Sequence, residues 1–215
     1  MVAAERPGWN AWHTIAGTLA SDPDRHGLRP KSGPALSPRT DSMIDPAIAD
    51  GIATAGTPRR SDQLVTRPRV LLVASAGGHW IELARLSAAF EGCECQFVST
   101  AGGMVAPDDG APVLQIRDSS RDTLPDMLRS VRAIWKIIRE HRPDIVVSTG
   151  AAPGAIALVL AKLHGARTVW IDSIANGDEL SMSGRAVLPF ADLRLTQWAH
   201  LTKRYRYLRY FGQIL

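Results

Sequence analysis

From residue 67 onward, short apolar runs alternate with stretches in which apolar residues recur every three or four positions. The runs predict buried strands, and the periodic stretches predict helices that pack on a sheet. We expect strands over residues 70–74, 96–100, 113–116, 144–148, 168–172 and 193–197. We expect helices over residues 79–90, 123–141, 154–164 and 184–190. This alternation indicates an α/β fold with a Rossmann-like, mostly parallel sheet covered by helices on both faces.

The longest expected helix, 123–141, carries an apolar stripe and a basic stripe. Its apolar residues have the spacing of a core-facing stripe, and they are Leu124, Met127, Leu128, Val131, Ile134, Trp135 and Ile138. Its cations step by three, four and three along another face, and they are Arg129, Arg132, Lys136 and Arg139. Such a charged stripe is usually only a solvated face. Beside Trp135, it is also suited to anionic lipid headgroups.

The first 66 residues have a different character. They hold seven of the 14 prolines and six glycines, and they show no sustained periodicity. We therefore expect a disordered N-terminal extension over residues 1–66 and one folded domain over residues 67–215. The extension has seven basic and seven acidic side chains, so the formal net charge of +4 lies in the domain. This modest excess fits an anionic surface or a phosphorylated ligand and does not demand nucleic acid.

Cysteine, histidine and hydropathy patterns exclude several classes of protein. Cys93 and Cys95 are too far apart along a strand to form a normal disulfide, and no second pair completes a zinc site. The six histidines have no ligand spacing. We expect neither a metal nor a cofactor. The first 30 residues lack the apolar core of a secretory signal, and the longest apolar run, 145–163, is interrupted by polar residues, Gly and Pro. We therefore expect no membrane span.

A strand, a glycine pair and a helix start follow one another around residues 70–86. Gly77 and Gly78 have no Cβ atom, so a ligand can approach the backbone N–H groups closely. A helix N-terminus also carries about half a positive charge, which favours phosphate. His79 lies in the same turn, and an imidazole exchanges a proton near neutral pH. It is a candidate base or phosphate ligand, with a solvated surface histidine as the alternative.

Two further loops follow the strands 144–148 and 168–172. Gly150 and Ala151 are small residues at the start of the next helix, and Asp172 lies at the end of its strand. Because the carboxyl ends of parallel strands meet at one edge, these loops predict a ligand-binding rim. Asp172 is a candidate to accept a proton from a sugar hydroxyl, and capping of the following turn is the alternative.

The spacing of the glycines argues against a dinucleotide site. Gly77 and Gly78 are adjacent and no third glycine follows, so the motif G-x-G-x-x-G is absent. No acidic residue ends the second strand, which closes at 99–101. These features disfavour an NAD-binding or nucleotide-binding Rossmann protein, which stays as the first alternative function. A basic RNA-binding module is the second alternative.

The last residues alternate cations with aromatic rings. The cations include Arg204, Arg206 and Arg209, between which the tyrosines stand. This interleaving suits a membrane interface or single-stranded RNA. A final helix that docks on its own domain is a third possibility, and self-docking or contact with a partner protein is the preferred interpretation.

Residues 69–215 resemble a known family of glycosyltransferase subunits. The segments that carry the resemblance are 75–79 followed by Glu82-Leu83, 142–151, 181–185, and Ala191-Asp192 with Gln197-Trp198. They are similar to the acceptor-side, membrane-associated subunit of two-part GT-B glycosyltransferases. This subunit is the anchor in the eukaryotic dolichol-linked chitobiose-forming GlcNAc transferase, and it has bacterial counterparts in exopolysaccharide and capsule synthesis. The amino-terminal half of the single-chain enzyme that makes lipid II is also similar.

The resemblance implies a single lobe of the N-terminal GT-B type that binds a polyprenyl-diphosphate-linked acceptor. By position, Gly77, Gly78 and His79 would fall in the acceptor-diphosphate loop, and Gly150 with Ala151 in a second loop. A separate donor-binding subunit would hold the UDP-sugar, because the chain ends at Leu215, where a linker to that half would begin.

The same resemblance implies a place in the cell. We expect a cytoplasmic subunit, attached peripherally to the inner face of the plasma membrane. The expected contacts with the anionic membrane surface are the cations of the helix 123–141 and the three C-terminal arginines. No nucleic acid partner is expected.

Overall fold

A computed structural model describes residues 67–107, 110, 112–117 and 124–214. These residues all belong to one compact unit. The N-terminal extension expected over residues 1–66 lies outside the described residues.

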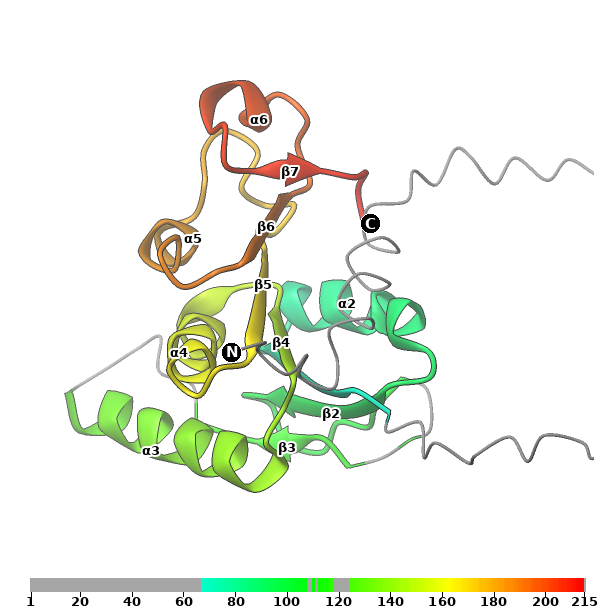
Figure 1. Cartoon of the computed structure of the whole chain (residues 1–215), viewed down its shortest axis with the longest axis vertical. Coiled ribbons are helices and arrows are strands. Elements are labelled where there is room, and N and C mark those ends of the chain that lie inside the picture. The colour runs from blue at the N-terminus through cyan, green and yellow to red at the C-terminus, as the bar shows by residue number, and fades with distance from the viewer. Residues whose placement is uncertain (1–66, 108–109, 111, 118–123, 215) are drawn as a thin grey trace, which may run out of the picture. The chain divides into compact units, whose positions relative to one another are not determined.

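The described residues form a seven-stranded sheet in which every paired strand is parallel. Along the chain the strands are β1 (Arg69–Ala74), β2 (Glu94–Ser99), β3 (Leu114–Gln115), β4 (Ile145–Ser148), β5 (Arg167–Ile171), β6 (Leu193–Thr196) and β7 (Arg209–Tyr210). Their order across the sheet is β3-β2-β1-β4-β5-β6-β7 (Figure 1). This order and the parallel pairing are those of a Rossmann-like fold, so the expected fold class is confirmed.

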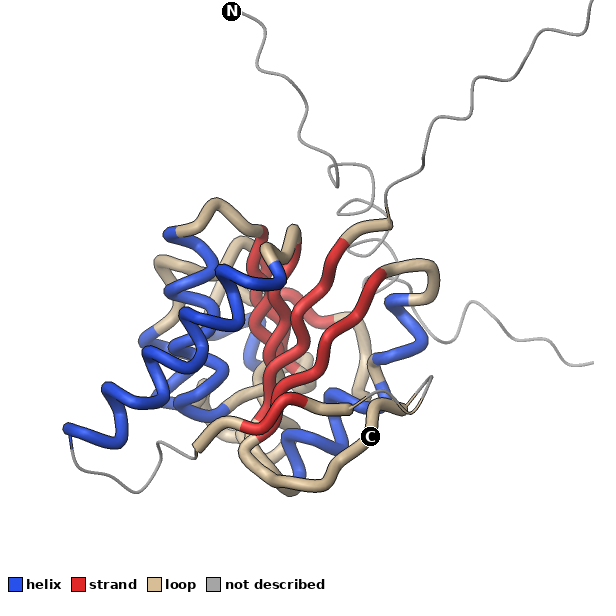
Figure 2. Tube along the Cα trace, turned by 90° about the horizontal axis from the view of Figure 1, so that it is seen from below, coloured by secondary structure: helices blue, strands red, loops and turns tan. Residues whose placement is uncertain are grey.

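Helices cover both faces of the sheet (Figure 2). The helices are α2 (Gly78–Arg85), the 3₁₀ helix η2 (Ser87–Phe90), α3 (Leu124–His141), α4 (Ala151–Leu163), α5 (Met182–Ala186) and α6 (Leu201–Arg204). Strand residues alternate between two buried clusters. Leu72 packs on the α2 side with Leu83, and Leu71 packs on the α3 and α4 side with Ile138. Each face of the parallel sheet is therefore buried, as its continuous apolar runs require.

The expected helix at 154–164 begins three residues earlier, at Ala151. Proline is unfavourable inside a helix, but Pro153 lies in the first turn, where a backbone N–H has no partner within the helix and proline is tolerated. The early start matters, because it brings the N-terminus of α4 directly to the end of β4.

The C-terminal segment is not the expected final helix. It consists of the short α6 and the strand β7, which extends the sheet beside β6. Leu201 and Leu208 are buried with Leu180, so the segment packs on its own domain. Docking on the domain was part of the preferred interpretation, but it occurs through a short helix and a strand, because two apolar anchors of this kind do not produce a helical period.

The core-facing stripe of α3 is narrower than the sequence predicts. Ile134 and Ile138 are buried, whereas Leu124, Leu128 and Trp135 are 71%, 58% and 41% exposed. The contact with α4 covers only part of the apolar surface of α3. The helix therefore has an exposed apolar stripe as well as a buried one.

Candidate functional site

The order of the sheet reverses between β1 and β4, and ligands of such folds bind outside the strand ends at that point. The two loops that leave these strands are joined by a reciprocal contact. The hydroxyl of Thr149 donates to the carbonyl of His79 at 2.7 Å, and His79 Nδ1 lies 3.1 Å from the Thr149 carbonyl. The structure therefore brings together the two loops that the sequence predicted as neighbours.

The contact with Thr149 also orients the imidazole of His79. A carbonyl oxygen only accepts hydrogen bonds, so Nδ1 must carry the proton in this contact. In the neutral ring Nε2 is then the unprotonated nitrogen. His79 thus has the geometry of a base or hydrogen-bond acceptor whose ring is held from behind.

Backbone conformation at the loops explains why small residues occupy them. Gly77 has φ 80° and Gly150 has φ 145°, which are conformations that side chains other than glycine rarely adopt. Ala151 has φ 63°. A Cβ atom at position 150 would lie 2.6 Å from His79 Nδ1, so glycine is needed there for space as well. Gly78, the first residue of α2, has open space around it.

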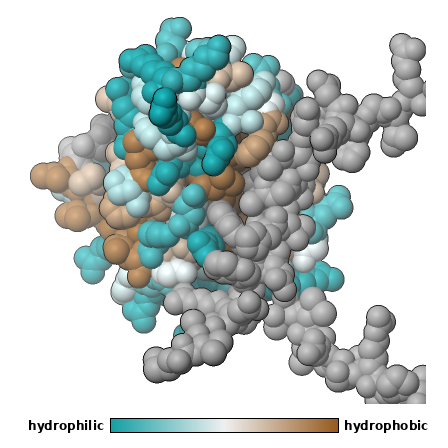
Figure 3. All heavy atoms as spheres, turned by 45° about the horizontal axis from the view of Figure 1, so that its top comes forward, coloured by the Kyte–Doolittle hydropathy of each residue, from teal (hydrophilic) through white to brown (hydrophobic). Residues whose placement is uncertain are grey.

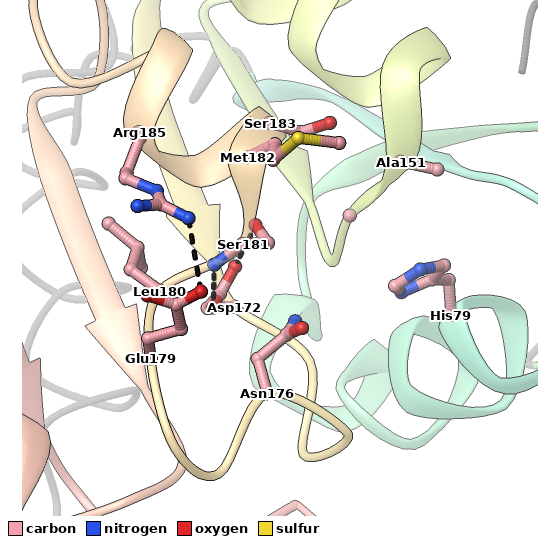
Figure 4. Close-up of a pocket in the computed structure, with 11 residues that line it drawn as sticks. His79, Ala151, Asp172, Asn176, Glu179, Leu180, Ser181, Met182, Ser183 and Arg185 are labelled. Carbon is pink, nitrogen blue, oxygen red and sulfur yellow. Dashed lines mark hydrogen bonds and ion pairs between the residues drawn. The ribbon is translucent and has the colours of Figure 1, made fainter.

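A pocket of about 410 Å³ opens beside these loops. On one side lie His79 and Ala151 (Figure 4). Gly150, which directly precedes Ala151, also lines the pocket. The opposite side comes from the chain after β5 and from α5, and its lining residues are Asp172, Asn176, Glu179, Leu180, Ser181, Met182, Ser183 and Arg185. The sequence pattern found the first side and Asp172. It also placed the loop after the strand 168–172, and with it Asn176 and Glu179, at the same rim, but it did not predict that residues 180–185 line the pocket.

Asp172 is the most constrained polar residue of the pocket. Its side chain is 1% exposed, and both of its carboxylate oxygens accept hydrogen bonds from the chain itself. Oδ1 accepts from Trp170 Nε1 at 3.1 Å and from the Ser181 hydroxyl, and Oδ2 accepts from the Ser181 backbone N–H at 3.0 Å. This arrangement favours the capping role that was the alternative for Asp172.

Gly184 closes this buried cluster. A Cβ atom at position 184 would lie 2.9 Å from Asp172 Oδ1 and 2.9 Å from Trp170 Nε1. We expect Gly184→Ala to lower the free energy of unfolding by about 1–3 kcal/mol, because neither atom moves without losing a buried hydrogen bond. Urea unfolding of the full chain measures this.

Gly78→Ala is the matched control for Gly184→Ala. A Cβ atom at position 78 meets no atom within 4 Å. Its unfolding free energy should stay within about 0.5 kcal/mol of the parent. Equal stability of the two variants would contradict the tight packing around Asp172.

Glu82 is a buried acid whose structural role the sequence pattern did not reveal. Its Oε1 accepts from the Ser173 hydroxyl at 2.7 Å and from the Ile174 N–H at 3.1 Å, so it ties α2 to the loop after β5. Its neighbour Ile81 is exposed, so the acid and not the apolar side chain is buried at this point of α2. The signal for its burial in the sequence is that Glu82 stands directly beside Leu83, among the apolar residues of this helix.

The two predicted sets of membrane-facing cations are not brought together. Arg129, Arg132, Lys136 and Arg139 are exposed on α3, at the bottom of Figure 1. Arg204, Arg206 and Arg209 belong to the segment of α6 and β7 at the top of that view. The two sets therefore lie at opposite ends of the domain.

Within the described ranges there is no group of three or more His, Cys, Asp or Glu residues that is arranged to hold a metal ion. Burial raises the pKa of the Cys93 thiol. None of the described helices is long and apolar enough to cross a membrane.

The fold and the joined loops define a Rossmann-like lobe of the GT-B type. Two solved structures share this fold, and their sequence identity to this chain is so low that the likeness concerns the fold alone. The MurG structure from Acinetobacter baumannii has a TM-score of 0.50 and 15% identity, over 60% of this chain and 41% of that chain. The UDP-GlcNAc 2-epimerase from Neisseria meningitidis has a TM-score of 0.52 and 11% identity, over 67% and 46%.

The resemblance to the anchor subunit family is confirmed by sequence comparison. Residues 113–214 match the family model described as "Oligosaccharide biosynthesis protein Alg14 like". The UDP-N-acetylglucosamine transferase subunit ALG14 of Eremothecium gossypii is 37% identical over 119 residues, which are 48% of this chain and 53% of that protein. The subunit of the same name from Rattus norvegicus is 23% identical over 195 residues, 74% of this chain and 86% of that protein. The chain spans about half the length of the Eremothecium relative.

Proposed function

We propose that this chain is the acceptor-binding subunit of a two-part glycosyltransferase that assembles a polysaccharide or a lipid-linked oligosaccharide. It binds a polyprenyl-diphosphate-linked acceptor, and a separate donor-binding subunit holds the UDP-sugar. The observation that carries the proposal is the pair of loops after β1 and β4, joined through His79 and Thr149 beside a pocket. The likeness to proteins named as UDP-N-acetylglucosamine transferase subunits supports it.

The glycine side of the pocket is suited to the diphosphate. Gly77, Gly78, His79, Gly150 and Ala151 lie where α2 and α4 begin. Both helices have their N-termini at this edge, and α4 is 13 residues long. Helix N-termini favour anions, and residues without a large side chain let a phosphate approach the backbone.

His79 has the position and the tautomer for a general base. In the proposed reaction, His79 Nε2 takes the proton of the acceptor hydroxyl as that oxygen attacks the anomeric carbon of the donor sugar. The new glycosidic bond forms as the bond from that carbon to the UDP oxygen breaks, and UDP leaves with the electron pair. Thr149 keeps the ring in place through Nδ1.

A nucleotide-binding Rossmann protein is the alternative function, and binding experiments separate the two. Equilibrium dialysis of the full chain alone with UDP-GlcNAc and with NAD should give no saturable binding below about 1 mM. A dissociation constant of that size corresponds to a binding free energy of about −4 kcal/mol. The reason is that the donor site belongs to the partner. Saturable binding of either nucleotide at micromolar concentration would favour the alternative.

The helix α3 is the proposed membrane-binding surface. It exposes Leu124, Leu128 and Trp135 next to cations, and Arg139 lies over the Trp135 ring at 4.6 Å. Exposed apolar residues beside Lys and Arg suit the boundary between headgroups and acyl chains of an anionic leaflet. The proposed attachment is peripheral, through α3, and the proposed location, which rests on the resemblance to the anchor subunit family, is the cytoplasmic face of the plasma membrane.

Replacing Arg132, Lys136 and Arg139 together with Gln should release the chain from anionic vesicles. Each cation near such a surface contributes about 1 kcal/mol, so the partition coefficient should fall by at least about tenfold at low salt. Vesicle flotation over a salt series measures this. The charge-matched control replaces Arg204, Arg206 and Arg209, which lie at the other end of the domain. Equal release by both triple variants would contradict a specific role of α3.

A further inference from the structure

The two sides of the pocket differ in chemistry (Figure 4). The side formed by His79, Gly150 and Ala151 offers backbone, helix N-termini and one imidazole. The side formed by the segment after β5 and by α5 offers side chains instead, and the polar ones are those of Asp172, Asn176, Glu179, Ser181, Ser183 and Arg185. A ligand that fills the pocket therefore meets a backbone-rich wall and a side-chain wall.

The side-chain wall is polar but not cationic. Among the lining residues that the structure describes, Arg185 is the single Lys or Arg, whereas Asp172 and Glu179 are two acids. With His79 neutral, the lining carries one net negative charge. Like charges repel strongly where water is partly excluded, so this wall disfavours a diphosphate.

The acids and the cation of this wall are arranged for hydrogen bonding. Both carboxylate oxygens of Asp172 already accept hydrogen bonds from Trp170 and Ser181, so this side chain holds the wall in place and does not bind the ligand itself. Arg185 Nη2 lies 3.4 Å from Glu179 Oε1, and these side chains are 45% and 53% exposed. An ion pair exposed to this degree contributes little to stability, so both groups can turn toward a ligand.

The hydrogen-bonding groups of this wall match a sugar ring. The Glu179 carboxylate accepts, the Arg185 guanidinium donates, and the Asn176 amide and Ser183 hydroxyl do both. A hexose presents many neutral hydroxyl groups that donate and accept. The pocket volume of about 410 Å³ lies within the usual range for small-molecule sites.

We infer that the wall of Asn176, Glu179, Ser183 and Arg185 binds the carbohydrate ring of the acceptor, while the diphosphate stays on the glycine side. This inference rests on the proposed function and adds a division of the site into two subsites. The two subsites explain why the pocket lining has few basic residues. The anionic part of the ligand would lie at the helix N-termini and would need no Lys or Arg from the opposite wall. His79 stands at the boundary, where the hydroxyl to be glycosylated would face Nε2.

Three ligands that share the farnesyl diphosphate group, two of them carrying a sugar, test this inference. Isothermal titration compares farnesyl diphosphate with its glucosyl and N-acetylglucosaminyl esters, using the full chain. At least one ester should bind at least about fivefold more tightly than farnesyl diphosphate, because the wall gains hydrogen bonds to hydroxyl groups. Asn176→Ala and Glu179→Gln should remove this gain and leave the affinity for farnesyl diphosphate within about twofold. Glu140→Gln, an exposed change on α3, is the control and should change neither affinity.

Three outcomes would overturn the inference. One is that neither ester binds more tightly than farnesyl diphosphate to the parent chain. Another is that Arg185→Ala weakens farnesyl diphosphate and the esters equally, which would make this the phosphate wall. The third is that UDP-GlcNAc shows the same sensitivity to Asn176→Ala, which would make the pocket a donor site. Partner-dependent sugar transfer can still be observed in the first two cases, so the proposed function stands or falls separately.

Discussion

Gly150→Val should lower the transferase activity of the assembled complex by at least about a hundredfold. The substitution puts a side chain at φ 145°, a conformation that valine avoids, and its Cβ atom would lie 2.6 Å from His79 Nδ1. The imidazole must then leave its place against Thr149. The valine side chain would also stand at the N-terminus of α4, where the diphosphate is proposed to bind, so the base and the acceptor site would be lost together. Steady-state rates with the donor-binding partner present measure the loss.

Gly92→Val is the matched control for backbone strain. Gly92 also has a positive φ, 82°, but a Cβ atom there meets no atom within 4 Å. It should cost stability without a comparable loss of activity in the folded fraction. An activity of Gly150→Val within about tenfold of the parent would contradict the close packing of His79 on the loop after β4.

His79→Ala should lower the activity of the complex by at least about tenfold, whether the imidazole acts as base or as diphosphate ligand. Folding and partner binding should survive, because His79 is only half-buried and contributes no core packing. His164→Ala is the control, since His164 Nδ1 also lies near a carbonyl, that of Leu160 at 2.9 Å, but on the exposed end of α4. Activity of His79→Ala within twofold of the parent would make His79 a surface residue.

The sheet was predictable because its strands are continuous apolar runs separated by helices. Each of the six expected strands overlaps an observed one, from β1 to β6. The strand β7 was not expected, since it has only two residues, Arg209 and Tyr210, and both are exposed. An edge strand of this length is held by backbone hydrogen bonds and leaves no hydrophobic period in the sequence.

The candidate site was predictable on one side, whereas on the other side only the loop after the strand 168–172 was. Gly77, Gly78, His79, Gly150 and Ala151 could be grouped because parallel strands end at the same edge. The other wall depends on how the chain after β5 folds back, and that path is set by the hydrogen bonds between Asp172 and Ser181. A contact across nine residues in an irregular segment has no periodic signature, so the part of this wall that α5 adds, with Ser183 and Arg185, could not be predicted.

The outer face of α3 illustrates a related limit. Apolar spacing placed Leu128 and Trp135 with the core, but the structure leaves both exposed. A helix whose apolar stripe is wider than its contact with the domain gives the same sequence pattern as a fully packed one. The face shown in Figure 3 likewise has apolar side chains among hydrophilic ones. Apolar spacing in a sequence therefore does not determine which apolar side chains are buried.

Transfer of sugar from UDP-GlcNAc to a polyprenyl-diphosphate-linked acceptor, measured with and without the donor-binding partner, tests the central claim most directly. In the proposed function, the Rossmann-like lobe described here supplies the acceptor loops around His79, and the donor site belongs to the other subunit. The account predicts no transfer by either protein alone and robust transfer when both are present. Sustained turnover by this chain in the absence of any partner would contradict it.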